Sequence, residues 1–284
     1  MDRKIVMKTT NKTETKVSKN NASGMGGDPD LLVEERRRRI RALVGERGRI
    51  TVAELARMFD ISQVTARNDL NALAEIGAVL RTRGGALAQR DDEDLPIGVK
   101  QNLRRAEKVR IAEAAVRMIG EGQTIVLDSG TTTAEIAKQI RGLKLQSVNV
   151  ITNALNIAVL LAGAPHVTLV MLGGVLRPSS YSLGGPQAEA ALAGLHADIL
   201  FLGFDGLDPE IGVMTPHLLE ARLNSRMLEI ARSVVAVGDS SKLGRRSLSV
   251  IAKIEQIDRI ITDAGAAPET VEALRSRGAQ VVLV

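Results

Sequence analysis

The stretch SQVTARNDLNALAEIG, residues 62–77, decides the fold of the N-terminal third of the chain. Ser62 is a typical helix N-cap and Gly77 a typical helix end, so the stretch predicts a helix. Apolar residues recur along it at helical spacing: Val64, Leu70, Leu73 and Ile76. Residues 52–59 predict a shorter amphipathic helix just before it, with Thr51 as the cap. Because only a short break separates the two segments, they predict a helix-turn-helix unit.

The neighbouring segments extend this unit to a winged helix-turn-helix domain over residues 31–88. Residues 31–44 carry apolar side chains at helical spacing and predict a first helix, and residues 50–52 are expected to enter the second. Two short apolar segments, at 79–80 and 86–87, flank the sequence RTRGG and predict a hairpin wing.

Charge is divided unevenly along the chain. The formal net charge is only +5, but residues 1–90 carry 18 Lys and Arg against 11 Asp and Glu. Residues 91–284 carry 20 against 22. A basic small domain joined to a nearly neutral large one indicates a module that binds a polyanion, attached to a module with another task.

In a helix-turn-helix unit the second helix enters the major groove of DNA, while the wing contacts the backbone. An arginine can form two hydrogen bonds to guanine, and Gln or Asn can do so to adenine. Arginines on a wing suit phosphates or a narrow minor groove. A single exposed arginine is often only a solvated charge, so the inference rests on the whole set. The candidate residues are Ser62, Gln63, Thr65, Arg67 and Asn68 on the helix and Arg81 and Arg83 on the wing.

The segments SQVTARNDL (62–70) and RTRGGA (81–86) resemble the DNA-binding signature of the DeoR family of bacterial transcriptional regulators. Members usually carry Ile or Val at position 66 and often Arg at position 68, where this chain has Ala66 and Asn68. The departures affect local packing and base preference. The resemblance also implies that Asp69 pairs with a nearby arginine inside the domain, since an acidic group would repel phosphate.

The rest of the chain predicts an α/β domain over residues 104–284. A helix is expected at 104–119. Short aliphatic strands then alternate with helices, as in a mostly parallel sheet covered on both faces. We expect strands at 124–127, 148–151, 167–172, 199–203, 234–237, 259–262 and 281–284, and helices at 132–140, 155–161, 188–192, 218–231 and 268–277. Residues 1–30 predict a disordered tail, and the acidic segment 89–103, which contains Pro and Gly, predicts a linker.

Polar and small residues follow the carboxyl ends of these strands, which is the edge where α/β sheets bind ligands. The sequence DSGTTT, 128–133, would place amides and hydroxyls at a helix N-terminus, where an anion such as phosphate can bind. Carboxylates there could accept hydrogen bonds from sugar hydroxyls, and a lysine could pair with phosphate. The alternative for each is ordinary capping of a turn. The candidate effector-binding residues are Asp128, Ser129, Gly130, Thr131, Thr132, Thr133, Asn153, Gly173, Gly174, Asp205, Asp239 and Lys242. Tyr181, Phe201 and Phe204 are the aromatic residues that could form an apolar wall.

These loops resemble the effector domain of DeoR-type regulators, so the resemblance covers residues 32–284. That domain is similar in fold to ribose-5-phosphate isomerase, and the family senses phosphorylated sugars. The resemblance implies that the loop 128–133 holds phosphate and that Asn153, Asp205, Glu220 and Lys242 line the pocket. Residues 201–206 and 220–227 are similar to the subgroup that represses N-acetylgalactosamine and related amino-sugar operons, whereas residues 215–219 depart from it.

Composition excludes several functions. With no Cys and three scattered His, disulfides, thiol catalysis and metal sites are not expected, and no motif for a cofactor occurs. No segment resembles a membrane span or signal peptide, which predicts a cytoplasmic protein. An isomerase of this fold would need a lysine after the strand that ends at Asp205, and residues 206–213 contain none.

The sequence therefore predicts a homodimeric or homotetrameric repressor, not an enzyme, whose partners are double-stranded operator DNA and a phosphorylated sugar. Two alternatives stay open: an isomerase-like enzyme with a tethered DNA-binding domain, and a nucleic-acid binder without ligand control.

Overall fold

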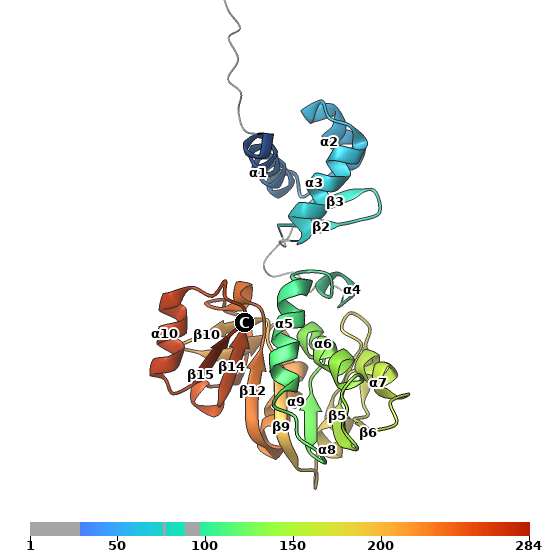
Figure 1. Cartoon of the computed structure of the whole chain (residues 1–284), viewed down its shortest axis with the longest axis vertical. Coiled ribbons are helices and arrows are strands. Elements are labelled where there is room, and N and C mark those ends of the chain that lie inside the picture. The colour runs from blue at the N-terminus through green and yellow to red at the C-terminus, as the bar shows by residue number, and fades with distance from the viewer. Residues whose placement is uncertain (1–28, 76–77, 89–96) are drawn as a thin grey trace, which may run out of the picture.

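The N-terminal domain is a winged helix-turn-helix fold, seen in a computed structural model that describes residues 29–75, 78–88 and 97–284 (Figure 1). Its helices are α1 (Pro29–Arg47), α2 (Val52–Phe59) and α3 (Gln63–Glu75). Its antiparallel sheet has the order β1 (Arg49–Thr51), β3 (Gly85–Ala88), β2 (Val79–Arg81). The expected tail, and the expected helix end at Gly77, lie outside the described residues.

The start of the second helix differs from the expectation. Residues 50 and 51 belong to β1 and pair with the wing strand β3, so the chain forms a third strand before α2 begins. Thr51 ends this strand and caps α2 in a capping box with Glu54. The pairing requires Gly85, because a Cβ there would lie 2.0 Å from the carbonyl oxygen of Ile50.

The core of this domain explains the periodicity of the sequence. Ala66, Leu70 and Leu73 of α3 are buried against apolar residues of α1, α2 and the sheet. Val64 was expected on the same apolar face, but 63% of it is exposed. It lies on the first turn of α3, outside the core.

The C-terminal domain contains a parallel sheet of seven strands, which confirms the predicted fold class (Figure 1). The strand order is β15-β14-β12-β9-β4-β5-β6. The strands are β4 (Thr124–Leu127), β5 (Val148–Thr152), β6 (Val167–Met171), β9 (Ala197–Gly203), β12 (Ala231–Val237), β14 (Arg259–Thr262) and β15 (Gln280–Leu283). The β12 strand takes in residue 231, which was expected at the end of a helix.

Helices cover both faces of this sheet. Alternate residues of β4, β5, β9, β12 and β14 enter two separate cores. One core contains α5 (Arg105–Val116), α6 (Thr131–Ile140) and α7 (Leu155–Leu161). The other contains α8 (Pro186–Ala191), α9 (Leu218–Ile230) and α10 (Pro268–Ser276). None of the helices among the described residues is long and apolar enough to span a bilayer.

Several elements were not predicted from the sequence. They include a hairpin of β7 (Val175–Arg177) and β8 (Ser182–Gly184), and a small sheet of β10 (Gly206–Asp208), β11 (Gly212–Thr215) and β13 (Ser249–Ala252). Short 3-10 turns lie at Ser240–Lys242 and Ile254–Gln256. The expected linker also differs, because residues 97–100 form the short helix α4 (Ile97–Lys100), whose first residue is buried.

Candidate functional site

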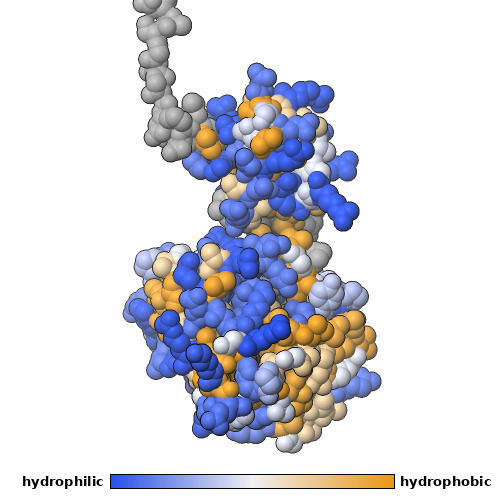
Figure 2. Space-filling view, turned by 45° about the vertical axis from the view of Figure 1, so that its right-hand side comes forward, coloured by the Kyte–Doolittle hydropathy of each residue, from blue (hydrophilic) through white to orange (hydrophobic). Residues whose placement is uncertain are grey.

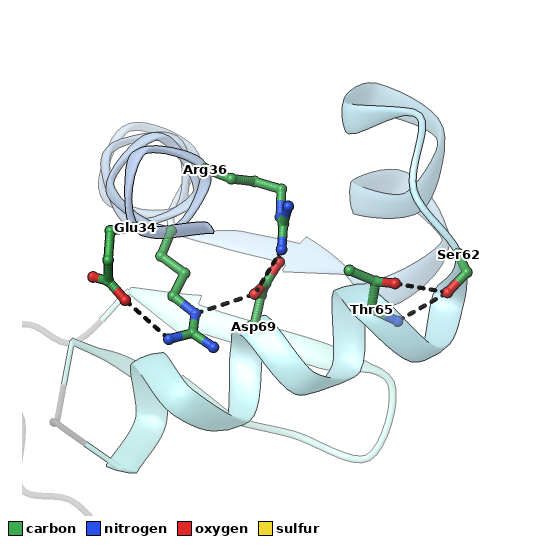
Figure 3. Close-up of polar contacts among 6 residues, drawn as sticks. Glu34, Arg36, Ser62, Thr65 and Asp69 are labelled. Carbon is green, nitrogen blue, oxygen red and sulfur yellow. Dashed lines mark hydrogen bonds and ion pairs between the residues drawn. The ribbon is translucent and has the colours of Figure 1, made fainter. Parts of the chain in front are cut away.

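The helix α3 presents one polar face to solvent. Ser62 caps the helix, since its Oγ accepts a hydrogen bond of 3.0 Å from the backbone N–H of Thr65, and the two hydroxyls share another of 2.9 Å (Figure 3). Both hydroxyls therefore hold the start of the helix. Gln63, Arg67 and Asn68 are exposed, and Arg67 Nη2 donates to Gln63 Oε1 one turn away, at 3.3 Å. These three side chains, together with the exposed Val64, form the part of α3 that is available to base edges.

The two wing arginines differ in their surroundings. The guanidinium of Arg81 donates to Asn71 Oδ1 at 2.8 Å, to the carbonyl oxygen of Thr82 at 3.1 Å and to that of Gly85. Arg81 thus ties the wing to α3, and its contact with DNA stays a prediction. Arg83 lies exposed in the turn between β2 and β3, a position suited to a phosphate contact.

Asp69 lies inside the domain, as the sequence predicted. Its carboxylate pairs with Arg36 at 2.6 Å and with Arg37 at 3.1 Å, and both arginines belong to α1 (Figure 3). Arg37 also reaches Glu34 at 3.0 Å. The pairs fix α3 relative to α1, so Asp69 positions the recognition helix.

The second site is a pocket at the carboxyl ends of β4 and β9. Eight of the candidate residues line it: Asp128, Ser129, Gly130, Thr131, Thr132, Asp205, Glu220 and Lys242. Residues 129–132 enter the pocket at the N-terminus of α6, where backbone N–H groups and the helix dipole favour an anion. The loop DSGTTT therefore occupies the position that the sequence predicted.

Asp128 organises that loop. Its Oδ1 accepts hydrogen bonds from the N–H of Gly130 at 2.9 Å and from Thr133 Oγ1 at 2.8 Å, and its Oδ2 accepts one from the N–H of Gly203 at 2.9 Å. Burial raises the pKa of Asp128, against the opposing effect of these hydrogen bonds. Because both oxygens are already bonded within the chain, Asp128 shapes the pocket wall.

Asp205 and Glu220 form the acidic side of the pocket. Asp205 pairs with Lys100 at 3.2 Å and accepts a hydrogen bond from Thr215 Oγ1 at 3.2 Å. Burial acts to raise the pKa of Asp205, but the ammonium groups of Lys242 and Lys100 outweigh burial and hold it below its ordinary value. Burial, with the charge of Asp205, raises the pKa of Glu220 to about 7, although Arg177 lies 3.3 Å away. The pKa values of these two carboxyl groups are thus shifted in opposite directions, that of Asp205 downward and that of Glu220 upward.

Lys242 supplies positive charge to the same pocket. Its Nζ donates to the carbonyl oxygen of Phe204 at 2.5 Å and lies 5.9 Å from the centre of the Phe204 ring. The ring of Phe204 lines the pocket, as one of the aromatic candidates for an apolar wall. Phe201 is instead fully buried in the core, and Tyr181 is exposed outside the pocket lining.

Five candidate residues lie outside the pocket lining, in contrast to the expectation from the sequence. Thr133 bonds to Asp128 beneath the loop, and Asn153 Nδ2 donates to the carbonyl oxygen of Leu183 at 3.0 Å. Gly173 and Gly174 lead into the β7–β8 hairpin. Asp239 accepts from the N–H of Ser241 at 3.2 Å and pairs with Arg104 at 3.6 Å. All five are at the predicted edge of the sheet, but their side chains or backbones hold neighbouring loops.

The pocket also contains residues that sequence reasoning missed. They come from α4, the β7–β8 hairpin and the end of β9: Ile97, Lys100, Arg177, Ser179, Ser180 and Gly203. Arg177 contacts Glu220 and His217 across the pocket. Beneath the pocket, burial and the charge of Lys242 lower the pKa of Lys108 to about 7. No local sequence signal distinguishes these residues, because long-range packing brings them to the site.

Within the described residues, no three His, Asp or Glu side chains lie together as a metal ion would require. The molecule thus combines a helix-turn-helix surface with a pocket in the α/β domain. These two parts define the class of DNA-binding proteins that carry a ligand-sensing domain.

Comparison with protein families specifies the class. The family model for the DeoR C terminal sensor domain matches residues 103–264, and the model for the DeoR-like helix-turn-helix domain matches residues 36–91. The chain belongs to the DeoR family of transcriptional regulators, which is a family of DNA-binding regulators and not of enzymes.

Individual relatives match over almost their whole length. A protein of Escherichia coli O157:H7, assigned as the transcriptional repressor of the aga operon, is 42% identical over 88% of this chain and 93% of its own. The regulator GlpR of Haloferax volcanii is 36% identical over 89% of this chain and 98% of its own. The transcriptional repressor AccR of Agrobacterium fabrum is 33% identical over 82% and 90%, respectively.

Among solved structures, a D-ribose-5-phosphate isomerase bound to phospho-erythronic acid matches 49% of this chain and 54% of its own, with a TM-score of 0.38 and 15% identity. A translation initiation factor eIF-2B of Pyrococcus horikoshii matches 84% and 90%, with a TM-score of 0.42 and 14% identity. Nothing about activity follows from similarities at this level.

Proposed function

We propose that this DeoR-family protein represses a sugar or amino-sugar catabolic operon and releases its operator when a phosphorylated sugar binds in the pocket of the α/β domain. The observation that carries the proposal is the arrangement of this pocket. The N-terminus of α6, the ammonium group of Lys242 and the carboxyl groups of Asp205 and Glu220 line the same pocket.

The donor groups of the pocket suit the phosphate of a sugar phosphate, and its carboxyl groups suit the sugar. The N–H groups and hydroxyls of residues 129–132 can donate hydrogen bonds to phosphate oxygens, and Lys242 can neutralise charge there. The carboxyl groups of Asp205 and Glu220 can accept hydrogen bonds from sugar hydroxyls or from an amino group. An amino sugar would agree with the resemblance of residues 201–206 and 220–227 to repressors of amino-sugar operons.

An isomerase function has less support. After Asp205 the chain turns into β10 and β11, and residues 206–213 contain no lysine that could act beside the carboxylate. The relatives that match over almost their whole length are named as transcriptional regulators or repressors. Binding without turnover therefore accounts better for the pocket.

We further propose that the working unit is at least a homodimer. Two-fold related α3 helices about 34 Å apart would match successive major grooves on one side of DNA. Exposed apolar side chains near the edge strand β6 support self-association: Leu155, Val159, Val170, Val175 and Leu176. Figure 2 shows hydrophobic surface, in orange, at the lower right of the α/β domain.

A mobility-shift assay with the DNA upstream of the protein's own gene tests the proposal. We expect the protein to retard this DNA and a phosphorylated hexose or hexosamine to reverse the shift, while the same unphosphorylated sugar has no effect. Absence of retardation would exclude the repressor, and conversion of the sugar phosphate would favour an enzyme. Retardation that no sugar phosphate relieves would favour a DNA-binding protein without ligand control.

A further inference from the structure

The segment 97–104 lies in the chain between the DNA-binding domain and helix α5, and we call it the strap. It begins directly after residues 89–96, which connect it to the DNA-binding domain, and ends at the N-cap of α5. Two of its side chains, Ile97 and Lys100, line the effector pocket. The part of the chain that leads to the DNA-binding domain is therefore also a wall of the pocket.

Three contacts join the strap to loops of the pocket and its surroundings. The N–H of Ile97 donates to the carbonyl oxygen of Ser179 at 2.7 Å, beyond β7. Lys100 Nζ pairs with Asp205 at 3.2 Å. Arg104 pairs with Asp239 at 3.6 Å. The strap thus contacts three separate loops at the edge of the sheet.

A buried lysine forms hydrogen bonds to the backbone of the strap. Lys108 on α5 is 3% exposed, and its Nζ donates to the carbonyl oxygens of Lys100 and Leu103 at 2.5 and 2.7 Å. These carbonyls lie at the end of α4 and in the turn after it, where a helix leaves its acceptors unsatisfied. A helix of four residues has little stability of its own, so these contacts determine where the strap lies.

A ligand in the pocket would change the contacts of the strap. A phosphate at the N-terminus of α6 competes with Asp205 for the ammonium group of Lys100, and the hydroxyls of a sugar compete with Lys100 for Asp205. A ligand shifts a conformational equilibrium only when it binds the two states differently, and exchange of this ion pair supplies such a difference. The position of α4 therefore depends on the ligand.

We infer that the strap, residues 97–104, couples the effector pocket to the DNA-binding domain, with Lys100 as a ligand-contacting residue that moves when a sugar phosphate binds. The inference rests on the proposed function and specifies how that pocket is regulated. Couplings of this kind usually change an affinity about 5- to 150-fold.

A reversible lock tests the inference in the full-length protein, which contains no cysteine. The double variant Ile97→Cys, Ser179→Cys would join the strap to the β7–β8 hairpin when oxidised, at two positions whose backbones already share a hydrogen bond. A control, Arg259→Cys with Gln280→Cys, links paired positions of β14 and β15 outside the pocket and leaves the strap unattached. The probe is galactosamine 6-phosphate, added to the protein on its upstream DNA.

Because residues 97 and 179 line the pocket, the reduced lock variant is the reference for its own oxidised form. We expect both forms of the control to release DNA at the same concentration of the sugar phosphate, and the oxidised lock variant to need at least about ten times more than its reduced form, or to stay bound. Release from the oxidised lock at the concentration that releases the reduced form would overturn the inference and leave the proposed function standing. Failure of every protein, including the unmodified chain, to respond to galactosamine 6-phosphate or to any other phosphorylated hexose or hexosamine would overturn both.

A second variant tests the role of Lys100 directly. Lys100→Met keeps the aliphatic stem and removes the ammonium group, so we expect titration calorimetry to show binding of galactosamine 6-phosphate weakened about ten-fold or more. Lys253→Met, at an exposed site outside the pocket, is the control and should bind as the unmodified protein does. Equal affinities for the two variants would contradict a ligand-contacting role for Lys100.

Discussion

Arg36 and Asp69 form an ion pair of 2.6 Å that joins α1 to the recognition helix α3 across 33 positions of sequence. Arg37 contacts the same carboxylate at 3.1 Å, and the Asp69 side chain is only 2% exposed. A buried carboxylate between two arginines has its charge satisfied inside the domain. The pair therefore sets the orientation in which α3 presents its polar face to DNA.

Replacement of this carboxylate should destabilise the N-terminal domain. Asp69→Ala would leave two guanidinium groups without their buried partner, and we expect a loss of about 3 kcal/mol in free energy of unfolding, measured by urea denaturation. Glu34→Ala removes the exposed partner of Arg37 and should cost at most about 0.5 kcal/mol. Similar losses for both variants would show that the Asp69 pairs do not fix α3.

Arg67 should determine operator specificity. Arg67→Ala removes an exposed guanidinium from α3, and loss of a two-bond contact to a base costs roughly 1–3 kcal/mol, or about 5- to 150-fold in affinity. Arg67→Lys should not restore specific binding, because an ammonium group lacks the forked geometry. Fluorescence anisotropy with operator and unrelated DNA of equal length measures the effect.

Binding of the sugar phosphate to Arg67→Ala should match that of the unmodified protein. A parallel loss of operator binding and of effector affinity would contradict the separation of the two sites.

The two wing arginines should respond differently to replacement. Arg83→Ala should leave the melting temperature unchanged, weaken binding to all DNA sequences, and lower the slope of log affinity against log salt by about 1. Arg81→Ala should lower the melting temperature, because it removes the hydrogen bonds to Asn71, Thr82 and Gly85. The reverse pattern would mean that Arg81 contacts phosphate and that Arg83 stabilises the wing.

This difference between Arg81 and Arg83 shows where prediction from the sequence ends. Helical periodicity and caps located α3, and continuous aliphatic segments located the parallel sheet, because both signals are local. Strand ends also identified the correct edge for Asp205 and Lys242, whereas the candidate Glu220, on α9, came from the family resemblance. The direction of a side chain at that edge depends on contacts distant in sequence.

Asp239 illustrates the point, since it follows a predicted strand but pairs with Arg104, and so holds the strap. Lys100 shows the converse. It was assigned to a linker, and only packing of α4 against the α/β domain brings it to Asp205, 105 positions away.

The protonation of Glu220 should make stability depend on pH. Burial raises its pKa to about 7 in the folded protein, above the ordinary value of 4.5. Between these values the folded state holds a proton that the unfolded state has lost, so the free energy of unfolding falls as pH rises through this window. The loss is complete above pH 7 and absent below pH 4.5. One pKa unit corresponds to 1.36 kcal/mol, so the total is at most about 3 kcal/mol.

Glu220→Gln should remove this dependence, because an amide does not ionise and its oxygen can still accept a hydrogen bond from Arg177. In urea denaturation, the variant should be more stable than the unmodified protein at pH 8 by about 1–3 kcal/mol, and the difference should shrink toward pH 5. Glu229→Gln, on the exposed surface of the same helix, should follow the unmodified protein at both pH values. A constant difference between Glu220→Gln and the unmodified protein across this range would mean that Glu220 is ionised in the folded state well below pH 7.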